Sequence, residues 1–255
     1  MDVEKLKQDP LLIFSLILEY AENNLEVDPA IKQVIIENKD LIKQVKPESL
    51  YEEFKRFMVT DNPTKYIREF KEVFFEFIPG LATTFGFEQN NPWHIYDVFE
   101  HTMHVIENTP AIEPLRIAAL FHDLGKPKVY TEETKTREDG STYTVGHFFG
   151  HAKVSKIFFD EFAGQMGIPQ EEMDLIGKLI VYHDFNLSTK PKKIQGYIDD
   201  LGKENVPLLF AIKKADNLAQ NLELSTKALQ EVERVEKAFD EYMQKQEEIS
   251  SYKKH

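Results

Sequence analysis

The chain has 255 residues, a formal net charge of −13 and no cysteine. This length allows one large domain or two small ones around a real hydrophobic core. The absence of cysteine excludes disulfide scaffolds, thiolate metal sites and cysteine nucleophiles. The acidic balance argues against tight binding of long nucleic-acid duplexes, which requires a basic surface. A small or single-stranded phosphorylated substrate is still compatible with it.

The longest apolar run, Leu11 to Leu18, is interrupted by Ser15 and is too short to span a bilayer. Glu19-Tyr20-Ala21-Glu22 follows it, where a signal peptide would have a cleavage site flanked by small residues. We therefore expect a cytoplasmic protein with no membrane partner.

Helical periodicity dominates the chain, and alternating strand patterns are almost absent. The first region contains three predicted helix starts, Asp9-Pro10, Asp28-Pro29 and Asn62-Pro63. Proline is tolerated in a first helical turn, and the preceding side chain can cap that turn. The third of these helices should carry Ile67, Phe70, Phe74 and Phe75 at helical spacing.

Changes in composition divide the chain into three parts. We expect a helical N-terminal region over residues 1–90, a histidine-rich domain over 91–221 and a charged amphipathic helix over 222–255. Within the second part, Asp139-Gly140 is flanked by threonine-rich segments, which predicts a small hairpin from Thr134 to Val145. The predicted fold class is all-α, with this β-hairpin as an insert.

Seven of the eight histidines lie between residues 94 and 183. His101 and His104 would lie on one helix, from Ile95 to Glu107, and compete for one role. Helical phase places His104 on the polar face and His101 at the border of the apolar face. His101 is therefore the better candidate to point into an interior site, and His104 is expected on the surface.

The segment Leu115 to Lys126 is apolar nearly all round and predicts a buried helix that Gly125 and Pro127 end. His122 and Asp123 lie at its end. A buried carboxylate is costly unless it is paired or bound to a metal. One cation could hold both side chains.

Three more metal-capable side chains occupy inward positions on predicted helices. His183 extends the stripe of Ile176, Leu179 and Ile180, Asp216 extends that of Leu209 and Ile212, and His151 leads one with Val154 and Phe158. A single inward histidine is usually a core residue satisfied by hydrogen bonds. Six such groups together would leave several polar atoms unpaired without a cation. Four imidazoles and two carboxylates suit a pair of divalent transition metals.

The series His101, His122-Asp123 and Asp216 resembles the signature of the HD superfamily of metal-dependent phosphohydrolases. His151 and His183 match the two further histidines of its two-metal members. The segments Asn90 to Thr102, His122 to Pro127 and Gly146 to His151 resemble the C-terminal half of bacterial tRNA nucleotidyltransferases (CCA-adding enzymes) that carry an HD domain. Glu26 to Pro29 and Lys46 to Ser49 resemble the neck and body of the same family. The resemblance covers roughly residues 10–220.

The chain departs from the CCA-adding family in one respect. No Asp-x-Asp pair follows a Gly-Ser turn, as the magnesium site of a nucleotidyltransferase head would need. Nucleotide addition is therefore not expected. The resemblance implies instead a phosphatase or a 2′,3′-cyclic phosphodiesterase that acts on a nucleotide or another small phosphoester.

The resemblance also implies roles for single residues. His101, His122, Asp123 and Asp216 would hold one metal and His151 and His183 the second, with Asp123 as the bridge. Iron or manganese is expected first, with zinc, nickel or cobalt as alternatives.

Further residues are expected around the metals. Lys126 should contact phosphate at the site mouth and share the catalytic role with Asp123, although a solvated lysine is an equal alternative. Lys153 is a weaker substrate contact. His147 would share a helix face with His151 as a reserve ligand or proton donor, and Asp184 would orient an imidazole.

Two other functions are compatible with the same candidate residues. An HD site with two irons can activate oxygen, and the ligand residues do not distinguish this chemistry from hydrolysis. A non-catalytic tRNA- or nucleotide-binding module is the other alternative. The charge of −13 counts against tight RNA binding, and the six ligand positions count against lost catalysis.

Overall fold

The computed structural model describes residues 3–252. Within this range the chain forms fourteen α-helices, two short 3₁₀ helices and one two-stranded antiparallel sheet, which confirms the all-α prediction. The predicted C-terminal helix is present as α14 (Leu222–Tyr252). The last three positions of the predicted range, 253–255, lie outside the described residues. None of the described helices is long and apolar enough to cross a membrane.

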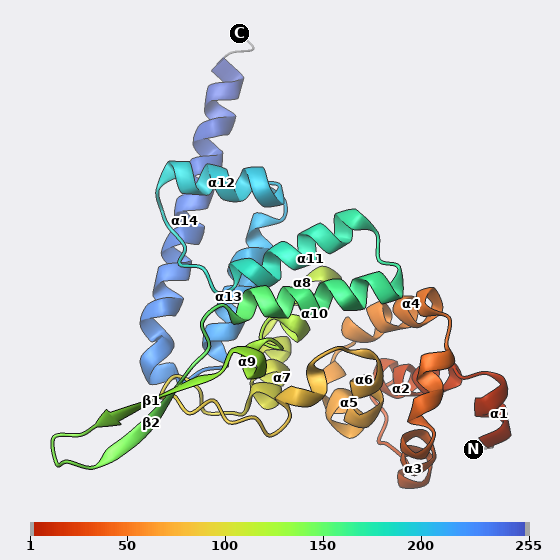
Figure 1. Ribbon diagram of the computed structural model, residues 1–255. Coiled ribbons are helices and arrows are strands. Elements are labelled where there is room, and N and C mark those ends of the chain that lie inside the picture. The colour runs from red at the N-terminus through yellow and green to blue at the C-terminus, as the bar shows by residue number, and fades with distance from the viewer. Residues whose placement is uncertain (1–2, 253–255) are drawn as a thin grey trace.

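The N-terminal helices gather at one side of the molecule (Figure 1). They are α1 (Val3–Gln8), α2 (Leu12–Glu22), α3 (Pro29–Glu37), η1 (Lys39–Gln44), α4 (Pro47–Met58), α5 (Pro63–Glu69), α6 (Lys71–Phe77) and η2 (Leu81–Thr84). The start of α3 is as predicted, because Asp28 caps it by accepting from the backbone N–H groups of Ala30 (2.8 Å) and Ile31 (3.2 Å). The start of α2 lies two residues after Pro10, at Leu12.

The helix predicted to begin at Pro63 is in fact two helices. The backbone leaves helical geometry at Phe70, with φ −120° and ψ 27°, so that α5 ends at Glu69 and α6 begins at Lys71. At this bend the buried Phe70 ring lies 6.3 Å from the ring of Tyr20. Tertiary packing therefore overrides the continuous helical period of the sequence.

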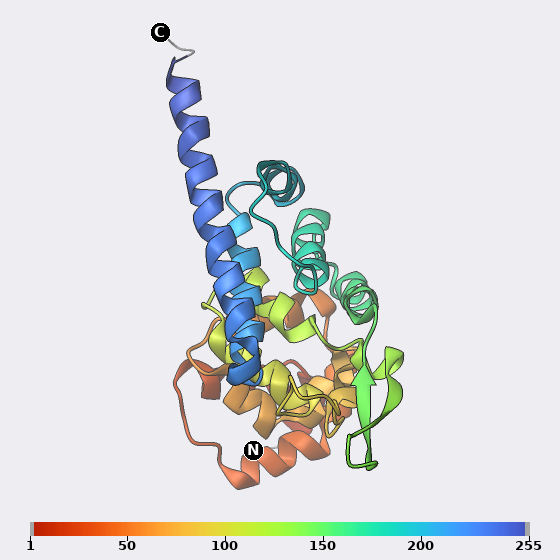
Figure 2. The ribbon, with the colours of Figure 1, turned by 90° about the vertical axis from the view of Figure 1, so that its left-hand side faces the viewer.

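The second part of the chain contains α7 (Val98–Asn108), α8 (Glu113–Phe121), α9 (Lys126–Val129), β1 (Thr131–Thr136), β2 (Thr142–His147), α10 (His151–Met166), α11 (Gln170–Tyr182), α12 (Pro191–Leu201) and α13 (Val206–Leu218). The hairpin is confirmed and is slightly longer than predicted, with Thr134 opposite Thr144. Gly140, at φ 82°, forms its turn. The hairpin and the far end of α14 both project from the body (Figures 1 and 2).

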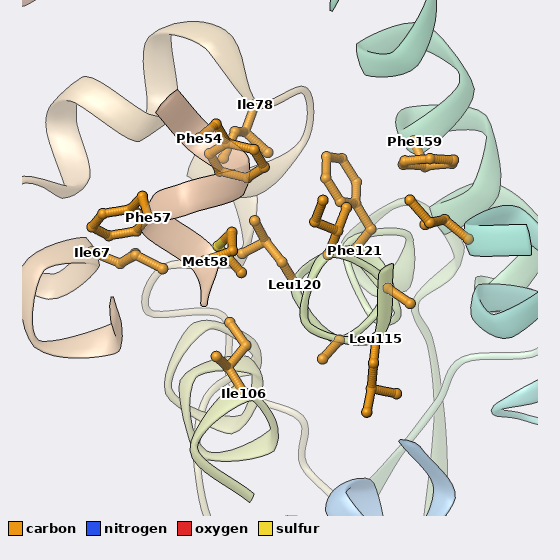
Figure 3. Packing of buried hydrophobic residues seen from close by; sticks show 14 of the residues in the cluster. Phe54, Phe57, Met58, Ile67, Ile78, Ile106, Leu115, Leu120, Phe121 and Phe159 are labelled. Atoms are coloured by element: carbon orange, nitrogen blue, oxygen red, sulfur yellow. The ribbon is translucent and has the colours of Figure 1, made fainter. Parts of the chain in front are cut away.

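One aromatic core joins the N-terminal helices to the second part. Phe54 of α4 lies 5.5 Å from Phe162 of α10, and Phe162 lies 5.1 Å from Phe121 of α8. Figure 3 shows Phe54 and Phe57 on one side of this contact, with Phe121 and Phe159 on the other. Since Phe121 precedes His122, the N-terminal helices help to fix the end of α8.

A buried arginine also links the two parts. The Arg116 guanidinium donates to the carbonyl oxygens of Met58 (2.9 Å), the last residue of α4, and Thr60 (2.6 Å), two residues beyond it. Only 6% of this residue is exposed. Terminal carbonyls of a helix have no partner within the helix, so Arg116 satisfies groups that would otherwise be buried without one.

We expect Arg116→Ala to lower the free energy of unfolding by about 2–3 kcal/mol, because it leaves buried carbonyl groups without a donor. Chemical denaturation measures this change. The matched control is Arg56→Ala, whose partner Glu22 lies in an exposed ion pair and whose cost should stay below about 1 kcal/mol. Equal costs for the two variants would contradict the linking role of Arg116.

Candidate metal centre

His101 lies near the start of α7, which Asp97 caps by accepting from the backbone N–H of Glu100 at 2.7 Å. This start makes the helix shorter than the range of 95–107 expected from the sequence. The His101 side chain is completely buried, whereas the side chain of His104 is one-third exposed. His104 Nδ1 lies 2.8 Å from a carboxylate oxygen of Glu107, away from the other histidines.

The other three candidate histidines occupy helix ends. His122 follows α8, His183 follows α11 and His151 begins α10. In each, Nδ1 lies close to the carbonyl oxygen three residues earlier: Ala119 (2.7 Å), Ile180 (2.5 Å) and Phe148 (2.9 Å), respectively. A carbonyl only accepts hydrogen bonds, so Nδ1 carries the proton and Nε2 keeps its lone pair. His101 makes a similar, longer contact of 3.4 Å with Ala219 O.

The four Nε2 atoms surround the carboxylate of Asp123, which is 1% exposed. Oδ2 lies 3.2 Å from His101 Nε2 and 3.1 Å from His122 Nε2. Oδ1 lies 3.1 Å from His151 Nε2 and 3.6 Å from His183 Nε2. Each carboxylate oxygen therefore faces its own pair of imidazoles.

These imidazoles also face one another. The Nε2 atoms of His101 and His122 are 3.4 Å apart, and those of His151 and His183 are 3.1 Å apart. If both nitrogens of a pair carry lone pairs, neither can donate to the other. Asp123 Oδ1 likewise has no hydrogen-bond partner, although His151 Nε2 lies 3.1 Å away. A divalent cation in each pair would satisfy these atoms, so the donor set fits a metal centre.

Asp216 on α13 completes the cluster. Its carboxylate lies 3.1 Å from His101 Nε2 and accepts from Gln220 Nε2 at 3.1 Å. Two groups of three residues each have their ligand atoms within 4.8 Å of one another: one is His101, His122 and Asp216, and the other is His122, Asp123 and His183. His122 belongs to both groups, so the two groups lie side by side.

The local charges favour a cation as well. Burial raises the pKa of Asp123, but the nearby charges of His122 and Lys126 outweigh burial and hold that pKa well below its usual range. Burial lowers the pKa of His101, but hydrogen bonds with Asp123 and Asp216 reverse the direction and raise it. The carboxylates therefore stay ionised, and protons compete with metal ions for the imidazole nitrogens.

Lys126, expected at the mouth of the site, lies deeper than that. It is 4% exposed, and its Nζ lies 2.6 Å from Asp123 Oδ2 and donates to Gln89 Oε1 at 2.7 Å. The same ammonium lies over the ring of Phe148, 5.3 Å from its centre. Lys126 thus provides a fixed positive charge beside the central carboxylate.

The other residues proposed around the metals lie farther out. His147 ends β2 rather than sharing a helix with His151, so the premise that it lies on the same helix face is wrong. Its Nε2 lies 3.1 Å from Glu133 Oε2. Lys153 is exposed on α10, and Asp184 is exposed but lines the same cavity as Asp123.

Sequence reasoning missed His94. Its ring centre lies 5.0 Å from that of His101, and its Nε2 accepts from Lys126 Nζ at 3.3 Å. Burial lowers the pKa of His94 to about 2, with the charge of Lys126 as the second cause. Its Nδ1 is buried without a partner. His94 precedes α7 in an irregular segment, where no helical period marks a residue as inward.

A cavity of about 810 Å³ opens onto the cluster. Asp123, His151, His183 and Asp216 line its floor, together with His94 and Lys126. Its walls come from the loop before α10 and from the first turns of α14. A small molecule can therefore reach the candidate ligands.

We expect Gly125→Ala to reduce metal content without replacing any ligand. A Cβ at Gly125 would lie 2.4 Å from His151 O and 2.6 Å from Ser155 N, so the start of α10 would have to move. We also expect a loss of about 1–3 kcal/mol in unfolding free energy. The control is Gly164→Ala in α10, where a Cβ meets nothing within 4 Å. Elemental analysis compares the two, and equal metal content would contradict the close-approach argument.

Asp123→Ala should lose at least one of two bound ions, because Asp123 is the one carboxylate that faces both imidazole pairs. His101→Ala should weaken the binding of one ion, whereas His104→Ala should keep both ions bound. Metal analysis after reconstitution and thermal melting with and without chelator provide the measurements. Metal content below about one ion per chain in the unmodified protein would contradict a two-ion centre.

Two family models match the chain. Residues 94–221, half of the chain, match the HD domain, and residues 24–82 match the probable RNA and SrmB-binding site of polymerase A. No curated protein matches the chain. The second match agrees with the resemblance of the N-terminal helices to the body of CCA-adding enzymes. HD domains bind divalent metals and are typical of metal-dependent hydrolases. This chain, with its buried cluster of histidines and aspartates in residues 101–216, belongs to the HD-domain family.

Proposed function

We propose that this protein is a two-metal phosphohydrolase that cleaves a phosphoester of a nucleotide. One observation carries the proposal. Four imidazole Nε2 atoms and the carboxylates of Asp123 and Asp216 converge on one cluster, and Asp123, His151, His183 and Asp216 expose that cluster to a cavity large enough for a nucleotide. Asp123 Oδ1 has no hydrogen-bond partner among the described residues, and the Nε2 atoms of each imidazole pair face one another.

The reaction is hydrolysis. The oxygen of a water molecule forms a new bond to phosphorus, the phosphorus–oxygen ester bond breaks, and the proton of the water passes to the departing alcohol. Two divalent cations, when bound, lower the pKa of coordinated water and neutralise the phosphoryl oxygens. His101, His122 and Asp216 would hold one of them, and His151 and His183 the other, with Asp123 between both.

The chain's own residues prepare this site in two ways. The carbonyls that accept from Nδ1 hold the imidazoles in one tautomer and one orientation. Lys126 supplies a positive charge 2.6 Å from the Asp123 carboxylate and lines the same cavity. That charge would help to stabilise negative charge that develops on phosphate oxygens in the cavity.

The match over residues 24–82 supports a nucleotide, or the end of an RNA, as the substrate. The net charge of −13 argues against a long duplex. A phosphatase acting on a nucleoside monophosphate and a 2′,3′-cyclic phosphodiesterase use the same ligands. The choice between them is a question for a substrate panel.

We expect the metal-reconstituted protein to hydrolyse at least one of a panel of nucleoside monophosphates and 2′,3′-cyclic nucleotides. Asp123→Ala should lower kcat by about 10²-fold or more, because both cation positions depend on that carboxylate. His104→Ala is the control and should keep the wild-type rate, since its side chain points away from the cluster. Phosphate release and chromatography of the products provide the measurement.

Three results would contradict the proposal. The first is the absence of hydrolysis on the whole panel with either iron or manganese bound. The second is an iron-loaded protein that consumes oxygen with an organic substrate. The third is incorporation of CMP or AMP into tRNA by the pure chain.

A further inference from the structure

An exposed aromatic ring marks one wall of the cavity. Phe149 is 82% exposed, more than any other large hydrophobic residue that the structure describes. One face of its ring stacks on His147, with 5.4 Å between the ring centres and an interplanar angle of 9°. Gly150 follows at φ 80°, and no atom lies within 4 Å of where its Cβ would be. The turn thus presents Phe149 beside the start of α10, with its second ring face free.

Trp93 contributes a second aromatic group to the same cavity and is 46% exposed. Its backbone is held on both sides. Its N–H donates to Asn91 Oδ1 at 3.1 Å, and its carbonyl oxygen accepts from the backbone N–H of Asn221 at 2.8 Å. The position of the indole is therefore linked to the residue that precedes α14.

Another part of the cavity is formed by α14, through Leu224, Lys227 and Glu231. These residues lie beyond the HD match, which ends at residue 221. Lys227 is exposed and has no ion-pair partner within residues 3–252. The cavity therefore combines candidate metal ligands of the HD domain with a wall from α14 that lies outside the HD match.

The cavity has room for a ligand larger than a phosphate group. About 810 Å³ falls in the range of pockets that hold molecules the size of a nucleotide or a drug. Exposed aromatic faces attract planar rings, and stacking on a nucleobase is tolerant of sequence because every base has such a face. A sugar phosphate without a base would leave both aromatic side chains in water.

We propose that Phe149 and Trp93 bind the nucleobase of the substrate, so that the metal centre receives the phosphoester of a nucleotide and discriminates against phosphorylated sugars. This inference rests on the proposed function and names its specificity-determining residues. Phe149 would stack on the base, and Trp93 would contact it from its own place in the same cavity. Neither residue touches the reacting phosphorus.

The chain contains a single tryptophan, so its fluorescence reports directly from this cavity. In the metal-loaded protein, adenosine 5′-monophosphate should quench this fluorescence saturably, and ribose 5-phosphate should not.

Phe149→Ala should raise the dissociation constant for adenosine 5′-monophosphate about tenfold, and Phe149→Tyr should restore it. Tyr143→Ala removes an exposed aromatic group on β2 outside the cavity and should leave binding and hydrolysis unchanged. Thermal melting checks that each variant is folded.

Two results would overturn the inference: equal quenching by the nucleotide and the sugar phosphate, or an unchanged dissociation constant in Phe149→Ala. The experiment separates this failure from failure of the proposed function. If ribose 5-phosphate is hydrolysed as efficiently as the nucleotide, the result supports the proposed hydrolysis and contradicts the aromatic nucleobase site. If the nucleotide quenches the tryptophan fluorescence as expected but no phosphoester is cleaved, the result supports the aromatic nucleobase site and contradicts the proposed hydrolysis.

Discussion

The ionised carboxylate of Asp123, buried at the centre of the molecule, is the constraint on which the rest of the site depends. A charge at 1% exposure is tolerated only when opposite charges and hydrogen bonds compensate it. Lys126 provides one compensating charge at 2.6 Å, and the surrounding imidazoles can hold cations that provide the rest. Glycine at position 125 lets α10 approach closely enough to bring His151 to the same carboxylate.

Backbone carbonyls at helix ends orient the imidazoles around this carboxylate. The last carbonyls of a helix lack partners within it, so an imidazole just beyond the end can donate to one of them. His122 does so after α8 and His183 does so after α11, each to the carbonyl three residues back. The proton is thereby fixed on Nδ1, and the lone pair of Nε2 points at Asp123. His151 contacts Phe148 O in the same way, so the backbone, rather than a set of further side chains, orients three of the four imidazoles.

The sequence was informative where helical phase decides burial and uninformative where tertiary contacts decide it. Phase alone separated the buried His101 from the partly exposed His104, and the apolar run before His122 predicted a buried helix end. Helical phase could not reveal His94, which lies in an irregular segment. It also could not reveal the bend at Phe70, whose ring packs near that of Tyr20. The burial of Lys126 likewise depends on Gln89, from a loop distant in sequence.

The two family matches describe segments that the structure joins physically. Phe162 packs between Phe54 of the N-terminal helices and Phe121 of α8, and Arg116 ties α8 to the end of α4. The region that resembles an RNA-binding body therefore supports the helix end that carries the His-Asp pair. The cavity walls, in contrast, come from α14 and from the loop before α10. The residues that shape the cavity wall are thus separate from those that compensate the buried charge at Asp123.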